Sequence, residues 1–130
     1  MKNILFVCKY NRFRSRIAEA YFKKINKKLK CSSAGLIKGN PIDPQIIKTA
    51  KKLELKINGT PRALSSKLLK KQDLIVIVAD NVPKSLFKNK TILIKVKDIE
   101  SNDKIKIEKK ILEIMKKIKI LNKNINKILR

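Results

Sequence analysis

A cysteine, an arginine and a serine near the N-terminus have a spacing that could support nucleophilic chemistry. Cys8 ends an apolar run, Arg14 follows six residues later, and Ser15 comes directly after it. A thiolate is a strong nucleophile, and amide dipoles together with a nearby arginine stabilise it relative to the thiol. A guanidinium can bind two oxygens of a phosphate-like anion at once. We therefore expect Cys8 to attack an oxyanion that Arg14 holds, with the Ser15 hydroxyl donating a hydrogen bond to the sulfur.

The residues between Cys8 and Ser15 are expected to form the loop that surrounds this anion. Successive backbone N–H groups and a following helix N-terminus make a natural anion site. Asn11 tolerates the left-handed conformation that a tight loop requires, and its amide could bind Ser33. Arg12 adds a cation that favours acidic substrates if it faces the pocket rather than solvent. The expected phosphate-binding and supporting residues are Lys9, Tyr10, Asn11, Arg12, Phe13, Ser15 and Ser33.

The hydrophobic pattern places this loop between a buried strand and a helix. Asn3–Cys8 is a continuous apolar run, which is typical of a strand covered on both faces. From Ile17 to Leu29 the apolar positions repeat with a helical period. Further strands are expected at 29–34, 74–79 and 91–96. Further helices are expected after Asp43, after Ser65 and, as one long helix, over 107–128.

Strands and helices alternate, which predicts an α/β fold with a four-stranded parallel sheet and helices on both faces. The 130 residues are expected to form a single domain, residues 1–130. Ligands of such sheets bind beyond the carboxyl ends of the strands. Cys8, Gly35, Asp80 and Asp98 all lie at or just past such ends, so one cleft could gather them.

The charge and the cysteine content of the chain limit which partners and compartments are expected for it. Lys and Arg number 34 against 10 Asp and Glu, a net charge of +24. Nucleic acid is a possible partner, but the lysines are spread over every predicted helix instead of forming one stripe with aromatic residues between them. Two cysteines make no disulfide framework, and the apolar N-terminal run is too short for a signal peptide or a membrane span. A cytoplasmic protein without a membrane partner is expected, and its charge should attract anionic substrates.

The segment C-K-Y-N-R-F-R-S, from Cys8, fits the C-x5-R-[S/T] signature of cysteine phosphatases. At the end of the first strand and before I-A-E-A, it resembles the low-molecular-weight protein tyrosine phosphatase family, which includes thioredoxin-linked arsenate reductases. The resemblance continues through S-S-A-G at 32–35, the P-I-D-P loop at 41–44 and the strand after Asp73, so it covers almost the whole chain.

This resemblance implies hydrolysis of phosphomonoesters, such as protein phosphotyrosine or small aryl phosphates, through a phosphocysteine on Cys8, without a metal or cofactor. It also implies a general acid after the fourth strand. Asp98 fits best, followed by Asp103 and then Glu100, although Asp98 or Asp103 could instead cap the last helix.

Two alternatives remain open. An arsenate reductase of the same fold would need an external thiol from thioredoxin or glutaredoxin, because residues 73–90 contain no cysteine and Cys31 is expected to be a buried apolar residue. A binding module would hold an oxyanion or nucleic acid without turnover. An inorganic oxyanion in the Cys8 loop is expected in all three cases.

Overall fold

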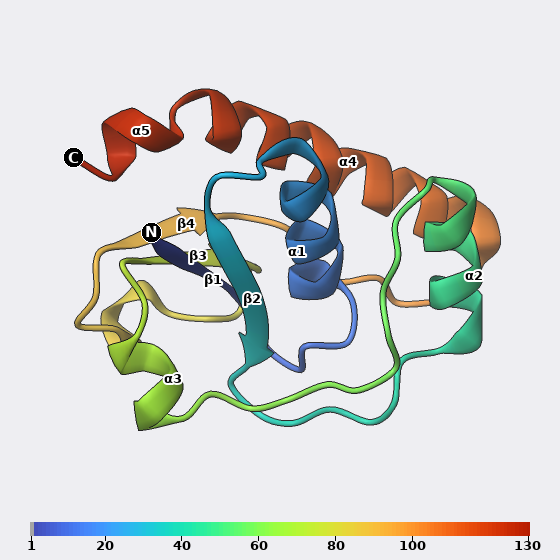
Figure 1. Ribbon diagram of the computed structural model, residues 1–130. Coiled ribbons are helices and arrows are strands. Elements are labelled where there is room, and N and C mark those ends of the chain that lie inside the picture. The colour runs from blue at the N-terminus through green and yellow to red at the C-terminus, as the bar shows by residue number, and fades with distance from the viewer. Residues whose placement is uncertain (1) are drawn as a thin grey trace.

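The computed structural model describes residues 2–130 and contains a four-stranded parallel sheet in the order β2-β1-β3-β4 (Figure 1). The strands are β1 (Asn3–Cys8), β2 (Lys30–Gly35), β3 (Leu74–Val78) and β4 (Thr91–Ile94). The helices are α1 (Arg14–Ile25), α2 (Pro44–Lys52), α3 (Ser66–Lys70), α4 (Lys104–Lys123), α5 (Ile125–Ile128) and the 3-10 turn η1 (Lys84–Leu86). The predicted α/β fold with a parallel sheet is confirmed.

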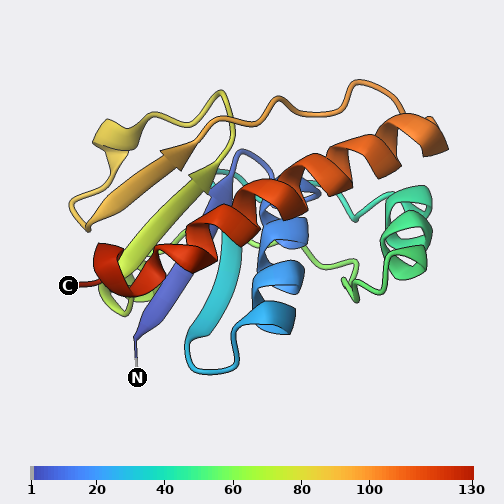
Figure 2. The ribbon, with the colours of Figure 1, turned by 90° about the horizontal axis from the view of Figure 1, so that it is seen from above.

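Side chains of β1 alternate between two apolar clusters, one on each face of the sheet. Ile4 and Phe6 pack with α1, α2 and α4 in the larger cluster. Leu5 and Val7 pack in the smaller cluster, which α3 and the loops around it cover. Figure 2 shows α4 running along the sheet and past α1 toward α2. β1 is therefore buried on both faces, as its unbroken apolar run predicts.

The expected helix caps form, and they set where three helices begin. The Asp43 carboxylate accepts a hydrogen bond from Gln45 N, and the Ser65 hydroxyl accepts one from Leu68 N. Asp103 accepts from Ile105 N at 2.8 Å and so caps α4. Each cap satisfies an N–H group that the helix itself leaves unpaired.

Several predicted boundaries are wrong by small amounts; β3, for example, ends at Val78 and not at residue 79. The single long C-terminal helix is interrupted at Asn124, which has a φ of −105° and a ψ of 4° and separates α4 from α5. β2 is shifted by one residue, because Gly35 pairs with Cys8. β4 ends at Ile94 and not at Val96, whose carbonyl oxygen accepts a hydrogen bond from the Arg14 side chain instead of from a strand.

Gly35 brings the end of β2 against the loop that follows β1. A Cβ at this position would lie 2.7 Å from Asn11 N and 2.7 Å from Tyr10 C, closer than real Cβ contacts come. Only glycine permits this approach of two backbones. In the described part of the chain, no helix is long and apolar enough to cross a membrane.

Candidate active site

The loop after Cys8 exposes a run of unpaired backbone donors. No N–H group from Lys9 to Ser15 donates a hydrogen bond to another residue within 2–130. Asn11 has a φ of 55°, the left-handed conformation predicted for it. Helix α1 begins at Arg14, so its own free N–H groups extend the run. Such a loop is suited to bind an anion through its backbone.

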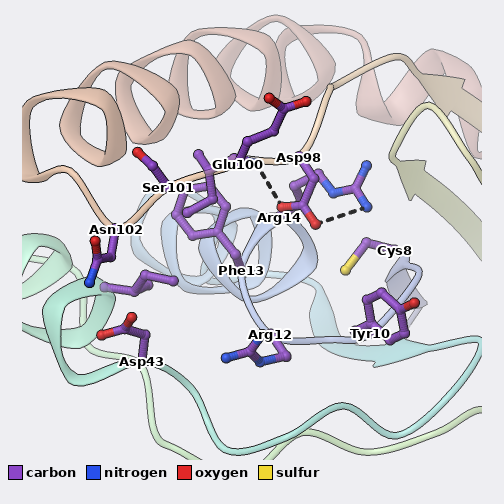
Figure 3. Close-up of a pocket in the computed structure, with 12 residues that line it drawn as sticks. Cys8, Tyr10, Arg12, Phe13, Arg14, Asp43, Asp98, Glu100, Ser101 and Asn102 are labelled. Atoms are coloured by element: carbon purple, nitrogen blue, oxygen red, sulfur yellow. Dashed lines mark hydrogen bonds and ion pairs between the residues drawn. The ribbon is translucent and has the colours of Figure 1, made fainter.

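A cavity of about 260 Å³ lies in front of this loop (Figure 3). Figure 3 shows the Cys8 sulfur pointing into the cavity, beside Arg14. The cavity is lined by Cys8, Tyr10, Arg12, Phe13, Arg14, Asp43, Ile46, Asp98, Ile99, Glu100, Ser101 and Asn102. The predicted cleft at the carboxyl ends of the strands therefore gathers Cys8 and Asp98, whereas Gly35 and Asp80 are not among the residues that line it.

The Arg14 guanidinium is held by residues from the second half of the chain. Its Nη1 donates to Asp80 Oδ1 at 3.1 Å and to the Val96 carbonyl oxygen at 2.9 Å. Its Nη2 donates to Asn81 Oδ1 at 3.2 Å. The side chain is 1% exposed. Nε of Arg14 donates to no other described residue, so this N–H group of the guanidinium is available to a ligand in the cavity.

Behind Cys8, side-chain hydrogen bonds connect the sulfur to β2. Cys8 Sγ lies 3.0 Å from Ser15 Oγ. Asn11 Nδ2 donates to Ser15 Oγ at 2.8 Å and to Ser33 Oγ at 3.0 Å. The predicted contact between Asn11 and Ser33 is confirmed, and all four residues are buried. Asn11 donates a hydrogen bond to the Ser15 oxygen. The single hydrogen of the Ser15 hydroxyl can therefore point toward the sulfur.

The three candidate acids lie in different surroundings. Asp98 Oδ2 is 3.7 Å from Arg14 Nη2, and its side chain is 44% exposed. Asp103 caps α4 and is absent from the cavity lining. Figure 3 shows the Glu100 carboxylate pointing away from Cys8. Of the three, only Asp98 places its carboxylate beside both the cavity and Arg14.

Arg12 and Tyr10 lie at the mouth of the cavity. Arg12 donates from Nε to the Asn40 carbonyl at 3.1 Å and from Nη2 to the Pro41 carbonyl at 3.3 Å. A Cβ at Gly39 would come within 2.6 Å of the Arg12 side chain, so the arginine stem is closely packed. Tyr10 is 38% exposed, and Lys9 Nζ lies 5.3 Å from its ring centre. Phe13, by contrast, is buried in the larger core cluster.

Cys31 lies away from the cavity. It is half-buried and contacts the Glu19 carbonyl oxygen, with 3.7 Å between Sγ and that oxygen. Burial first, and then the charge of Glu19, raise the pKa of the Cys31 thiol to about 12. This side chain is therefore a thiol, and a weak nucleophile, at neutral pH.

Several residues make supporting contacts around the site that were not predicted from the sequence. Asp80 and Asn81 hold Arg14, and Arg62 N donates to Asn11 Oδ1 at 3.0 Å. Glu19 accepts from the Ser33 hydroxyl at 2.6 Å. The position of Asp80, directly after a central strand, could have indicated that it lies near the site. No sequence pattern indicates the roles of Arg62 and Glu19, because their contacts depend on how distant segments pack.

Comparison with known proteins gives a consistent set of relatives. A family model described as low molecular weight phosphotyrosine protein phosphatase matches residues 3–124. No curated protein matches. A low molecular weight protein tyrosine phosphatase from T. tengcongensis is 25% identical, with a TM-score of 0.83 over 95% of this chain and 99% of that one. An arsenate reductase from Archaeoglobus fulgidus is 25% identical, with a TM-score of 0.75 over 91% and 97% of the two chains. The YwlE arginine phosphatase from Geobacillus stearothermophilus is 16% identical and has a TM-score of 0.81 over 98% and 94%.

Proposed function

The chain belongs to the low molecular weight phosphotyrosine protein phosphatase family, and we propose that it hydrolyses phosphomonoesters through a covalent phosphocysteine on Cys8. The observation that carries this proposal is the row of unpaired N–H groups from Lys9 to Ser15 beside the Cys8 sulfur. These groups, together with Nε of Arg14, can bind the oxygens of a phosphoryl group directly above the nucleophile.

In the first step, the Cys8 thiolate attacks phosphorus, and the bond between phosphorus and the leaving oxygen breaks. The loop amides and Arg14 stabilise the charge on the remaining phosphoryl oxygens. Protonated Asp98 donates its proton to the leaving oxygen, so that a neutral alcohol or phenol departs. Asp98 is suited to this role because its 44% exposed carboxylate lines the cavity and lies within 3.7 Å of Arg14.

In the second step, water attacks the phosphocysteine. Asp98, now a carboxylate, accepts a proton from the water, and the sulfur leaves as a thiolate. The Ser15 hydroxyl, 3.0 Å from Sγ, stabilises that thiolate with a hydrogen bond. Inorganic phosphate then leaves the loop, and the enzyme returns to its starting state. These steps use only side chains and amides of this chain.

The cavity suggests what the phosphoryl group is attached to. Tyr10, Ile46 and Ile99 give its walls an apolar part on which an aromatic ring can rest. A phosphotyrosine side chain or a small aryl phosphate is therefore the proposed substrate class. Arg12 lies at the mouth, held by two backbone carbonyls, where it can contact an acidic flanking group.

The second candidate is arsenate reduction, favoured by the similarity to the Archaeoglobus fulgidus arsenate reductase. Reduction of arsenate requires two electrons, which thiols supply as they form a disulfide. Cys31 is the only other cysteine of the chain, and its pKa of about 12 makes it a poor donor. An external dithiol such as thioredoxin would then be needed, so hydrolysis is the simpler function for this site.

One side-by-side experiment tests the proposal. Hydrolysis of an aryl phosphate and thioredoxin- or glutaredoxin-dependent reduction of arsenate are measured with the wild type and with Cys8→Ser. We expect aryl phosphate hydrolysis by the wild type, unchanged by a metal chelator and abolished by Cys8→Ser. Hydrolysis that survives Cys8→Ser would contradict the mechanism. Arsenate-dependent oxidation of the dithiol without phosphatase activity would favour the second candidate.

A further inference from the structure

The two edges of the sheet are covered differently. β2 is one edge strand, and its last residue, Gly35, pairs with Ala63 from the loop before α3. β4 is the other edge strand and has a strand neighbour, β3, on one side only (Figure 2). An uncovered edge strand presents backbone donors and acceptors to any further strand that approaches it.

The free backbone groups of β4 follow from its pairing with β3. N–H groups of β3 and of the residue after it donate to the carbonyl oxygens of Lys90 and Ile94, so the even-numbered residues bond to β3. The backbone groups of Leu93 and Lys95 therefore point to the opposite side. Within residues 2–130, their one recorded partner on that side is Lys117 Nζ, which donates to the Lys95 carbonyl at 2.8 Å. Leu93 thus keeps a free donor and a free acceptor.

An apolar groove of about 360 Å³ lies along this edge. Its lining combines residues 92–94 of β4 with side chains of α4 and α5, which include Lys117, Ile120, Leu121 and Ile128. We call it the β4 groove. Ile120 is 54% exposed there, although its side chain is fully apolar. The β4 groove shares no lining residue with the cavity in front of Cys8.

Apolar side chains lie on both faces of the free edge. Ile92 and Ile94 pack against the larger core cluster, so Leu93 between them points to the opposite face of the sheet. Leu93 is 48% exposed. Side chains of an added strand would alternate between the two faces, so that one set meets the β4 groove and the other set meets Leu93. The edge is therefore suited to an extended segment with apolar residues.

The segments that form the groove carry only positive charge. Residues 81–97 contain five lysines, and residues 114–130 contain five lysines and one arginine, with no Asp or Glu in either segment. Lysines beside an edge strand oppose its pairing with a second copy of the same chain, because like charges then face each other. The same lysines attract an extended segment that carries Asp or Glu at its ends.

Protection of the edge by lysines does not explain why Leu93 and Ile120 are exposed. Apolar side chains surrounded by charged ones are typical of a binding surface. Nucleic acid fits this surface poorly, since single-stranded bases stack on aromatic side chains and the lining of the β4 groove contains none. The chemistry of the groove therefore favours a protein segment.

We propose that the β4 edge binds an extended acidic segment of another protein, which adds a fifth strand to the sheet beside β4. The free N–H and C=O groups of Leu93 pair with the backbone of that segment. Its alternate apolar side chains enter the β4 groove and contact Ile120. Acidic residues at its ends meet the lysines on either side of β4, such as Lys90 and Lys97. This docking site does not depend on the reaction at Cys8.

The experiment measures binding of a fluorescein-labelled peptide to the full chain by fluorescence anisotropy. The peptide consists of Val-Thr-Val-Thr-Val between Glu-Asp and Asp-Glu. A control peptide has proline in place of the central valine, which keeps the charge but removes an N–H group and disturbs strand pairing. The protein variants are Ile120→Glu, inside the β4 groove, and Leu112→Glu as the matched control. Both side chains are exposed on α4, but Leu112 does not line the groove.

The wild type is expected to bind the valine peptide at least about tenfold more tightly than the proline peptide. Ile120→Glu should weaken binding of the valine peptide by about tenfold or more, because it places a charge against the apolar side chains of the peptide. Leu112→Glu makes the same change in net charge and should alter the affinity by no more than about twofold. Amide hydrogen exchange, followed by NMR, should slow at Leu93 when the valine peptide is bound.

Four results would overturn the proposal. The first is absence of binding, and the second is equal binding of the two peptides or equal weakening by the two variants, which would mean that charge alone attracts the peptide. The third is unchanged amide exchange at Leu93 in the saturated complex. The fourth is a different occupant: a dimer of the free protein that Ile120→Glu dissociates, or binding of an oligothymidylate that Ile120→Glu weakens more than Leu112→Glu does.

Discussion

Asp98 and Arg14 come from opposite halves of the chain, yet Asp98 Oδ2 lies 3.7 Å from Arg14 Nη2 at the wall of the cavity in front of Cys8. Asp103, only five residues further on, faces the N-terminus of α4. Two carboxylates in one short loop therefore have different surroundings, because Asp98 lies beside a guanidinium and Asp103 accepts hydrogen bonds from the first N–H groups of α4.

The first prediction follows from this difference. Asp98→Asn should slow hydrolysis of substrates with poor leaving groups by on the order of 10²-fold or more, since an amide cannot protonate the leaving oxygen. Substrates with activated leaving groups should be slowed much less. Steady-state kinetics on alkyl and nitrophenyl phosphates measure the contrast.

Asp103→Asn is the matched control for Asp98→Asn. Asparagine is also a good helix cap, so this change should alter neither stability nor turnover appreciably. Leaving-group sensitivity in Asp103→Asn, with none in Asp98→Asn, would transfer the role of general acid to Asp103.

The second prediction concerns the geometry of Arg14. Arg14→Lys keeps the positive charge but loses the planar fork that Asp80, Asn81 and the Val96 carbonyl hold in place. Turnover of an aryl phosphate should fall by roughly 10² to 10³-fold, as when one oxyanion donor is removed. Steady-state kinetics, with circular dichroism to confirm the fold, provide the measurement.

Asp80→Asn is the companion of Arg14→Lys, because asparagine keeps an oxygen that can accept the 3.1 Å hydrogen bond from Nη1. Asp80→Asn should lower turnover by no more than about tenfold, because it keeps the hydrogen-bond acceptor for Arg14 and removes only the negative charge. An Arg14→Lys enzyme with near-normal turnover would show that charge alone suffices.

The third prediction tests the close approach at Gly35. Gly35→Ala places a methyl group 2.7 Å from backbone atoms of Tyr10 and Asn11, which cannot move aside as a side chain can. The free energy of unfolding should fall by about 1–3 kcal/mol, and turnover should fall with it, because the loop is displaced. Chemical denaturation and aryl phosphate kinetics measure the two effects.

Gly59→Ala is the control for Gly35→Ala. The nearest atom to a Cβ at Gly59 is a side-chain carbon of Ile47 at 3.9 Å, an ordinary contact. The change should leave stability unaltered or raise it slightly. Equal effects of the two substitutions would mean that the contact of Gly35 with the loop is unimportant.

The fourth prediction uses pH to separate the two cysteines. Burial and the charge of Glu19 raise the pKa of Cys31 to about 12, so at pH 8 only about one Cys31 in 10⁴ is a thiolate. Because the pKa is raised, alkylation of Cys31 should increase about tenfold per pH unit from pH 8 to near pH 12. Inorganic phosphate should protect Cys8, whose sulfur points into the cavity, and should leave Cys31 unprotected.

Cys31→Ser and Cys8→Ser assign the two rates. The alkylation that phosphate suppresses should persist in Cys31→Ser and disappear in Cys8→Ser. If phosphate protected Cys31, or if alkylation of Cys31 did not increase with pH, the half-buried environment assigned to Cys31 would be wrong.

The sequence was most informative where structure depends on neighbouring residues. The apolar run of β1, the helical period after Ile17 and the helix caps at Asp43 and Ser65 are local patterns, and each predicted its element. The left-handed conformation of Asn11 also follows from residue type, since few other side chains tolerate it.

Features that depend on distant contacts could not be predicted in this way. β4 ends early because the Val96 carbonyl binds Arg14, 82 residues away in the chain. The break at Asn124 in the helix over 107–128 has a local cause that was missed, because the Asn124 side chain donates to the carbonyl of Ile120, four residues before it, and so competes with the helical pattern. Glu19 reads as an ordinary solvent-facing helix residue until β2 brings Ser33 against it.

The long reach of the Arg14 contacts has a consequence for how this protein is made. Arg14 precedes the groups that hold it, Asp80, Asn81 and Val96, by 66 to 82 residues. The guanidinium therefore does not have all three partners until Val96 has been translated. During synthesis it becomes fixed in place only when β3 and the segment after β4 dock onto β1 and α1.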